Sequence, residues 1–245
     1  MRLVRKNINI LGTKFHHITR SEAAAFIVKC LQERKKASVF TPNPEIVMEA
    51  YHDSRLQAIL NDSELVVPDG IGVVIASKLL GQPLPERVAG FDLIQEVFNQ
   101  IQNKEIKVYF LGAGQGVAEL AKKKMEEKYT NLKIVGVHNG YFDNDEHIVA
   151  SINALDPDFL LVGLGAPKQE YWIDNNRDRL NASVLMGVGG SFDGMSGKVK
   201  RAPDIYIKLG LEWFYRLITQ PTRAKRMVRL PIFLLKVIVE GKKYL

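Results

Sequence analysis

Six short apolar segments recur along the chain, and a longer stretch with helical character separates each from the next. The segments are rich in Val, Ile, Leu and Phe, and they read ASVF (37–40), ELVV (64–67), KVYFLG (107–112), KIVGV (133–137), DFLLVGLG (158–165) and SVLMGVG (183–189). Such alternation predicts βαβ units. Parallel strands are buried on both faces, which explains why the segments are continuously hydrophobic. The predicted fold class is therefore α/β, with a Rossmann-like, mostly parallel sheet flanked by helices.

Basic residues are concentrated at the C-terminal end of the chain. Residues 198–245 contain twelve Lys or Arg and three Asp or Glu, a net charge of +9, so residues 1–197 carry −2 of the total of +7. The same segment holds the aromatic triplet 213–215 and the apolar run PIFLLKVIV at 231–239. The composition predicts an α/β domain over residues 1–197, a basic amphipathic helical appendage over residues 198–245, and an anionic partner.

The apolar run in the appendage is too short to cross a membrane. It has nine residues and contains Lys236, whereas a spanning helix needs about 20 apolar residues. It can lie in the membrane interface, where each Lys or Arg gains about 1 kcal/mol from anionic lipid. The N-terminal sequence lacks the apolar core of a signal peptide, and Cys30 is the single cysteine. We therefore expect a cytoplasmic protein bound peripherally to the inner face of the cell membrane.

Five loop segments, four of them rich in glycine, follow the predicted strands. They read TPNPE (41–45), PDGIG (68–72), GAGQG (112–116), GLGAPKQE (163–170) and GVGGSFDG (187–194). Parallel α/β sheets bind ligands beyond the carboxyl ends of their strands, where helix amino termini favour anions. One such loop is often only a turn, but five on one edge predict a ligand site. A dinucleotide is not favoured, because Val117 replaces the third glycine of the fingerprint and His138 stands near the place of its acid.

Seven segments, in the same order along the chain, resemble a known family. They read TPNPEIV (41–47), VVPDGIGVV (66–74), ERVAGFDL (86–93), FLGAGQGVAE (110–119), GLGAPKQEYWI (163–173), VGGSFDGMSGKVKRAP (188–203) and LGLEWFYRLITQPTRAKRM (209–227). Together they are similar to the WecG/TagA/CpsF glycosyltransferases of bacterial surface polysaccharide and wall teichoic acid synthesis. The resemblance covers almost the whole chain and is strongest to the TagA-type, teichoic acid branch.

The resemblance implies an inverting transfer of a sugar from a UDP-sugar to a polyprenyl diphosphate-linked acceptor, without a metal or other cofactor. In the teichoic acid branch the donor is UDP-N-acetylmannosamine and the acceptor carries N-acetylglucosamine. Family members differ in their donor, so N-acetylmannosaminuronic acid and glucose stay open as alternatives.

The resemblance also suggests which side chains act. Inversion by direct displacement needs a base for the acceptor hydroxyl, and Asp69 matches the position of the family's proposed base. A helix cap is the alternative for Asp69, and Asp193 is the other candidate carboxylate, with a turn-forming role as its alternative. Thr41 and Asn43 match residues that position the sugar or the acceptor, although Asn43 fits an N-cap equally well.

Three further side chains match motif positions near the expected substrates. Gln169 is expected to contact the donor. Lys168 fits either a phosphate contact or an exposed helix start. Arg87 fits either an anchor for acceptor phosphate or a structural ion pair with Glu86 or Asp92.

The departing UDP gains negative charge that protein groups must stabilise if no metal is present. Arg216, Arg223 and Arg226 match appendage arginines that supply this charge in the family, and a basic face for membrane attraction is the alternative. Gly112 and Gly114 are expected to let the backbone approach the substrate.

A metal-binding pattern and two rival functions are less well supported. Asp143, Asn144 and Asp145 form an Asp-x-Asp triplet that can hold a divalent ion, but an acidic helix start explains it more simply. His16 and His17 have no spaced partners for zinc.

Two other functions compete with the glycosyltransferase. The basic C-terminal segment could bind nucleic acid, but the negative charge of residues 1–197 argues against this. A non-catalytic membrane protein is the other alternative. Homo-oligomerisation is possible, but the sequence does not specify it.

Overall fold

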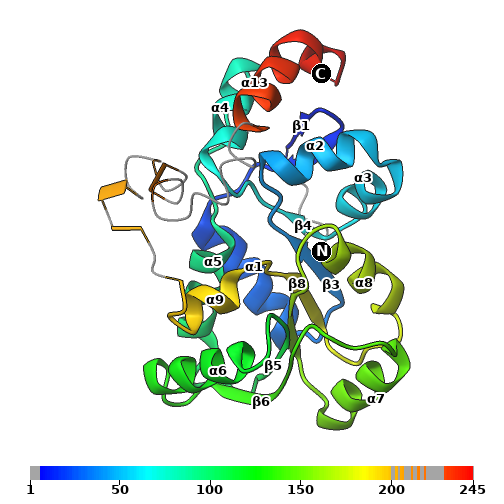
Figure 1. The fold of residues 1–245 in the computed structure, drawn as a ribbon, viewed down its shortest axis with the longest axis vertical. Helices are drawn as coiled ribbons and strands as arrows, with labels where there is room; N and C mark the ends of the chain where they lie inside the picture. The colour runs from blue at the N-terminus through cyan, green and yellow to red at the C-terminus, as the bar shows by residue number, and fades with distance from the viewer. Residues whose placement is uncertain are drawn as a thin grey trace.

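The computed structural model describes residues 6–199, 202–203, 205–206, 211, 214–215, 218 and 229–244. Its centre is a six-stranded sheet of order β4-β3-β8-β7-β5-β6, in which every neighbouring pair is parallel (Figure 1). The strands are β3 (Ala37–Phe40), β4 (Leu65–Val66), β5 (Lys107–Gly112), β6 (Lys133–His138), β7 (Phe159–Gly163) and β8 (Val184–Gly187). All six predicted strands and the α/β class are confirmed.

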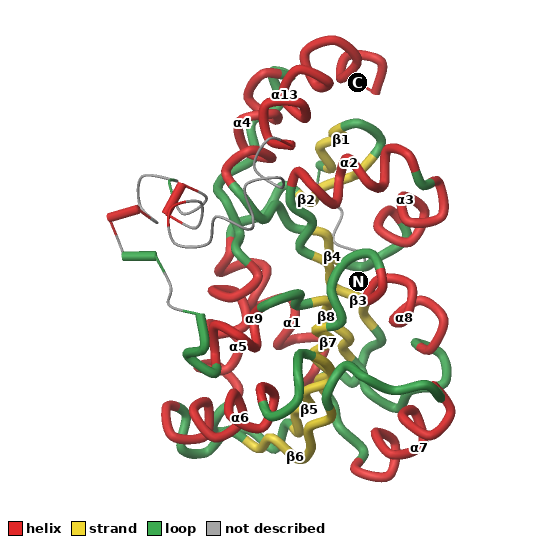
Figure 2. Tube along the Cα trace, in the orientation of Figure 1, coloured by secondary structure: helices red, strands yellow, loops and turns green. Residues whose placement is uncertain are grey.

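The sheet lies between two helical layers (Figures 1 and 2). The helices on one face are α1 (Arg20–Gln32), α5 (Gly90–Ile101), α6 (Val117–Lys128) and α9 (Ser191–Met195), and those on the other are α3 (Ser54–Asn61), α7 (Asp145–Leu155) and α8 (Lys168–Asn176). Each layer forms one apolar cluster with the strands, so all residues of β3, β7 and β8 are buried. Cys30 is buried in the first cluster, which confirms its packing role.

A third cluster at the β4 end of the sheet joins the two ends of the chain. Its elements are an antiparallel hairpin of β1 (Asn7–Ile10) and β2 (Thr13–His16), α2 (Pro44–His52), α4 (Ile71–Leu79), α13 (Arg229–Glu240) and the 3-10 helix η2 (Gly241–Tyr244). The hairpin was not predicted from the sequence. Its strands have only four residues each, and the connecting Leu11-Gly12 pair is not one of the usual hairpin signals.

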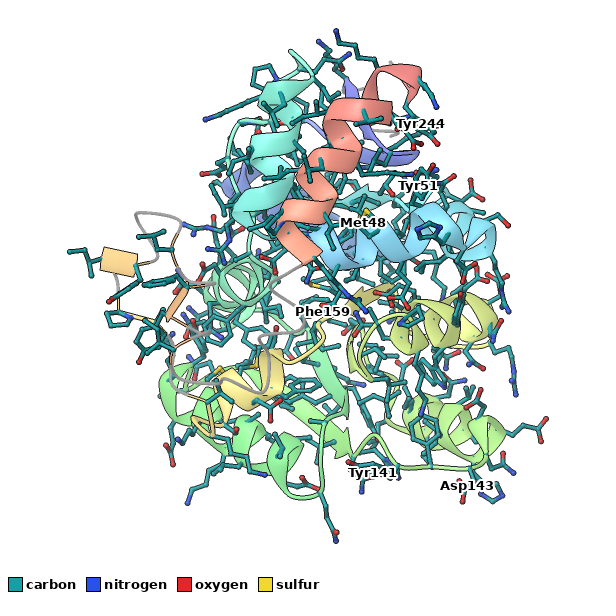
Figure 3. The ribbon with its side chains drawn as sticks, turned by 45° about the horizontal axis from the view of Figure 1, so that its top comes forward. Met48, Tyr51, Tyr141, Asp143, Phe159 and Tyr244 are labelled. Atoms are coloured by element: carbon teal, nitrogen blue, oxygen red, sulfur yellow. The ribbon has the colours of Figure 1, made fainter. Side chains whose placement is uncertain are left out.

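The last helix of the predicted appendage packs against the α/β domain. Phe233 and Val237 of α13 are fully buried, and the Tyr51 hydroxyl on α2 donates a 2.6 Å hydrogen bond to Glu240. In Figure 3, Tyr51 and Tyr244 lie close to this helix. The domain boundary at residue 198 stays a prediction. Within the described part of the chain, no helix is both long and apolar enough to cross a membrane.

Candidate active site

The carboxyl ends of the parallel strands meet at one edge of the sheet, and the glycine-rich loops lie there together. Backbone hydrogen bonds join neighbouring loops and strand ends, from Asp69 N to Pro42 O (3.2 Å), from Val188 N to Val162 O (2.9 Å) and from Ala113 N to Gly163 O (2.9 Å). The predicted gathering of these loops on one edge is therefore confirmed.

Asp69 lies just beyond β4, and its carboxylate is held from two sides. Oδ2 accepts a hydrogen bond from Gly90 N at 3.4 Å, and Oδ1 lies 3.5 Å from Arg87 Nε. The Asp69 side chain is still 32% exposed, so it is oriented and also open to a ligand. Asp69 does not cap α4, whose N-cap is Gly70 without a side-chain bond, but its carboxylate does contact the first N–H of α5 at Gly90. An acceptor-phosphate role for Arg87 stays a prediction.

Two glycines allow the loops around Asp69 to pack closely. A Cβ on Gly90 would lie 2.9 Å from Thr41 Oγ1, so the Thr41 hydroxyl lies directly against the start of α5. Gly70 has φ +87°, and a Cβ there would also press on Pro44 at 3.3 Å. Thr41 and Asp69 are thus brought together with Arg87, as the motifs predict, although their roles toward a substrate stay predictions.

Asn43 forms the N-cap of α2. Its Oδ1 accepts a hydrogen bond from Ile46 N at 3.0 Å, and Pro44 and Glu45 follow in the first turn. The cap role is therefore confirmed. Because the bond to Ile46 engages only Oδ1, the Nδ2 group can still meet a ligand, and that second role stays a prediction.

Gln169 links the loops that follow β7 and β8. Its Oε1 accepts from Gly189 N at 2.9 Å, and its Nε2 donates to Glu170 Oε1 at 2.9 Å. The amide lies over the last residue of β8, since a Cβ on Gly187 would be 2.9 Å from Nε2. Only 4% of Gln169 is exposed. Through these contacts Gln169 joins the two loops. A contact between Gln169 and the donor stays a prediction.

Lys168 and Asp193 lie in the helices that leave these loops. Lys168 is the exposed first residue of α8, and its Nζ lies 5.6 Å from the centre of the Phe142 ring. Asp193 lies in the first turn of α9, and its backbone oxygen accepts from Ser196 Oγ (3.0 Å) and Val199 N (3.1 Å). The helix-start role of Lys168 is confirmed. A phosphate contact for Lys168 and a substrate role for the Asp193 carboxylate stay predictions.

Gly112 and Gly114 differ in what surrounds them. Gly112 ends β5 with φ +129° and is pressed against the backbone of Gly163, whereas Gly114 has ordinary space around it. Both lie in the loop between β5 and α6 at the common edge. The space around the two glycines does not test whether either one contacts a substrate.

The Asp-x-Asp triplet begins a helix. Asn144 caps α7 by accepting from Glu146 N at 2.9 Å, and Asp145 Oδ1 accepts from Trp172 Nε1 at 3.0 Å. The helix-start interpretation is confirmed. In Figure 3, Asp143 lies at the end of the molecule opposite α13. Among the described residues, no group of three or more His, Cys, Asp or Glu side chains is placed to hold a metal ion.

Arg216, Arg223 and Arg226 lie outside the described residues. The chain is described again from Arg229, whose Nη1 lies 2.8 Å from Glu45 Oε1 on α2. Leu230 follows, and its Cδ1 would be 2.4 Å from a Cβ on Gly72 of α4. The first turn of α13 therefore lies beside the loops that follow β3 and β4.

Comparison with known proteins gives one consistent result. The profile of the glycosyl transferase WecG/TagA/CpsF family matches residues 8–244. The chain belongs to this family. A Bacillus spizizenii protein is 39% identical over 208 residues, covering 85% of this chain and 81% of its own length. A Bacillus subtilis protein is 39% identical over 212 residues (86% and 83%), and a Staphylococcus aureus protein is 36% identical over 239 residues (96% and 94%).

All three relatives carry the name N-acetylglucosaminyldiphosphoundecaprenol N-acetyl-beta-D-mannosaminyltransferase. Family membership confirms the resemblance drawn from the seven motifs, and the protein is a glycosyltransferase. The edge that gathers Thr41, Asp69 and Arg87 is therefore the candidate active site of a glycosyltransferase.

Two site residues were missed by the sequence analysis. Gly90 donates to Asp69, and its only sequence signal is its place in the ERVAG motif beside Arg87. Glu170 is 2% exposed although it is an acid. Its signal is a position three residues before Ile173 on α8, which places both on the buried face of the helix.

Proposed function

We propose that the protein transfers N-acetylmannosamine from UDP-N-acetylmannosamine to N-acetylglucosamine linked to undecaprenyl diphosphate, in teichoic acid synthesis. The names of relatives that share 36–39% identity with the chain support this reaction. The observation that carries the chemistry is the Asp69 carboxylate, oriented by Arg87 and Gly90 yet partly exposed at the ligand edge of the sheet.

In the proposed mechanism Asp69 accepts the proton of the acceptor hydroxyl while that oxygen attacks the anomeric carbon of the donor. The bond from this carbon to the UDP oxygen breaks on the opposite face, so the configuration inverts. Arg87 and Gly90 hold the carboxylate in one orientation, and the Thr41 hydroxyl is available to hydrogen-bond the sugar.

The leaving UDP needs positive charge, and we assign this role to the appendage arginines. Arg216, Arg223 and Arg226 fall outside the described residues, but Arg229 is bonded to Glu45 beside the active-site loops. Guanidinium groups bind phosphate through two parallel hydrogen bonds. Backbone N–H groups of the glycine-rich loops are the second source of stabilisation, so the proposal requires no metal ion.

The test is UDP release from a panel of UDP-sugars, with a short-chain lipid diphosphate N-acetylglucosamine acceptor and EDTA present. We expect acceptor-dependent release from UDP-N-acetylmannosamine that survives EDTA. Release from UDP-N-acetylmannosaminuronic acid or UDP-glucose alone would identify that UDP-sugar as the donor in place of UDP-N-acetylmannosamine. Release that EDTA abolishes would overturn the metal-free mechanism, and no release from any donor would indicate a different acceptor.

We also propose that α4 and α13 form a membrane-facing surface on the cytoplasmic side. The two helices lie side by side (Figure 1). Their exposed apolar side chains, here called the α4/α13 surface, are Ile75, Leu79, Ile232, Leu235, Ile238 and Val239. The α13 members are 50–73% exposed, and exposed Lys78, Lys242 and Lys243 accompany them. An apolar strip with lysines at its border suits the interface of an anionic bilayer.

The double substitution Leu235→Ser and Ile238→Ser is expected to weaken binding to anionic vesicles at least about tenfold, because two apolar side chains no longer enter the interface. Vesicle co-sedimentation measures this. Leu120→Ser is the matched control, since Leu120 is 41% exposed on α6, away from this surface. Equal binding by all three proteins would contradict the membrane role. A self-association that only the double substitution abolishes would assign the surface to a second copy instead.

A further inference from the structure

A buried acid lies directly behind the active-site edge. Glu170 is 2% exposed. One carboxylate oxygen accepts from Gln169 Nε2 at 2.9 Å, and the other finds no hydrogen-bond partner among the described residues. An ionised carboxylate in such a place is costly, because hydrogen bonds in the described part of the chain reach only one of its oxygens. The neighbouring α8 residues Trp172 and Ile173 are ordinary apolar core side chains, so the helix could pack here without an acid.

Glu170 and the Gly189 N–H together determine which way the Gln169 amide points. An ionised carboxylate only accepts hydrogen bonds, so the amide must turn its NH₂ group toward it. The amide oxygen then faces Gly189 and accepts from the Gly189 N–H at 2.9 Å. A protonated carboxyl both donates and accepts, and it would allow the reversed amide, whose NH₂ group cannot accept from Gly189.

The Gly189 turn is a suitable place for the donor. It follows β8, which lies between β3 and β7 near the middle of the sheet. Gly163 packs on the carbonyl side of the turn, because a Cβ there would be 2.9 Å from Gly189 O. The other side is open, since a Cβ on Gly189 would meet no atom within 4 Å among the described residues.

We propose that ionised Glu170 is a positioning residue that locks the Gln169 amide and so holds the Gly189 turn in the form that receives the diphosphate of the donor. This inference rests on the proposed function. It adds a pH-sensitive element to the donor site, one that acts through Gln169 and does not touch the reacting atoms.

The charged surroundings of Glu170 agree with such a role. Burial raises the pKa of Glu170 to about 6, the hydrogen bond from Gln169 opposes this rise, and Glu49 on α2 adds to it. The other charged or titratable groups on the packed elements are Glu45 and His52 on α2, Asp53 and Arg55, which contact Tyr171, and on α8 itself Lys168 and Asp174. β7 and β8 carry none. Glu170 therefore ionises, and fixes the Gln169 amide, as the pH rises through about 6.

The test uses the full chain and two readouts. In ¹⁵N-glycine-labelled protein, the Gly189 amide resonance, assigned by its loss in Gly189→Ala, is expected to shift with a midpoint near pH 6. The Kd for UDP-N-acetylmannosamine without acceptor is expected to be about three- to tenfold weaker at pH 5 than at pH 7.5, the effect of one hydrogen bond. The diphosphate of this donor is esterified at both ends, so it lacks the terminal phosphate group that titrates near pH 6.

Two variants separate Glu170 from histidines that titrate in the same range. Glu170→Gln should remove the Gly189 transition and make the Kd independent of pH between 5 and 7.5, whereas Glu49→Gln should keep the transition and lower its midpoint. A transition that persists unchanged in Glu170→Gln would overturn the inference, as would its absence in the natural protein. If Glu170→Gln does not fold, an unchanged midpoint in Glu49→Gln overturns it. A normal Gly189 transition without UDP-sugar binding would support the positioning of Gln169 by Glu170 and refute the proposed function.

Discussion

Replacing Asp69 by Asn is expected to lower kcat for acceptor-dependent sugar transfer by about 10²- to 10⁴-fold, the usual contribution of a positioned general base. The amide oxygen can still accept from Gly90 N, so the loop geometry is largely kept. The Kd for the UDP-sugar should change little, because the base acts on the acceptor hydroxyl. Steady-state UDP release and donor titration measure the two quantities separately.

Asp193→Asn is the matched control for this substitution. Both residues are partly exposed carboxylates in loops or first helical turns at the same edge of the sheet. We expect Asp193→Asn to reduce kcat less than about tenfold. The reverse result, a large loss in Asp193→Asn with an active Asp69→Asn enzyme, would transfer the role of base to Asp193. Urea unfolding of both variants shows whether any loss of activity is a loss of folded protein.

The parallel sheet and the position of its ligand edge could be predicted from the sequence because they depend on local patterns. Helices cover both faces of the sheet, so segments such as FLLV in β7 are continuously apolar. Once the strands are parallel, the residues that follow them must share an edge. Thr41 after β3 and Asp69 after β4 are therefore neighbours although 28 residues separate them in number.

Contacts within the site could not be predicted, because they join residues without a shared local pattern. Gly90 donates to an acid 21 positions earlier, and Gln169 accepts from a glycine 20 positions later. Each bond depends on how two loops approach, to within a fraction of an ångström. The hairpin of β1 and β2 was not predicted for a related reason, since it packs against elements far away in the sequence, β4, α3 and α4.

Replacing Gly112 by Ala is expected to destabilise the protein by about 2–6 kcal/mol, a sum of backbone strain and overpacking. Gly112 has φ +129°, a conformation that L side chains rarely adopt, and its Cβ would lie 2.4 Å from Gly163 O. Both contacting groups belong to the backbone of paired central strands, β5 and β7. Neither can move without breaking the ladder. Urea unfolding followed by circular dichroism measures the loss.

Gly114→Ala provides the comparison two residues further along the same loop. A Cβ at Gly114 would make ordinary contact with Val117 Cγ2 at 3.7 Å, so its free energy of unfolding should change by less than about 1 kcal/mol. The two glycines look equivalent in the GAGQG motif, and only the approach of β7 distinguishes them. Equal stability of both variants would mean that β5 and β7 are not so close at their carboxyl ends. If instead the Gly114→Ala variant keeps its stability and binds the donor more weakly, the bound UDP-sugar occupies the space beside Gly114.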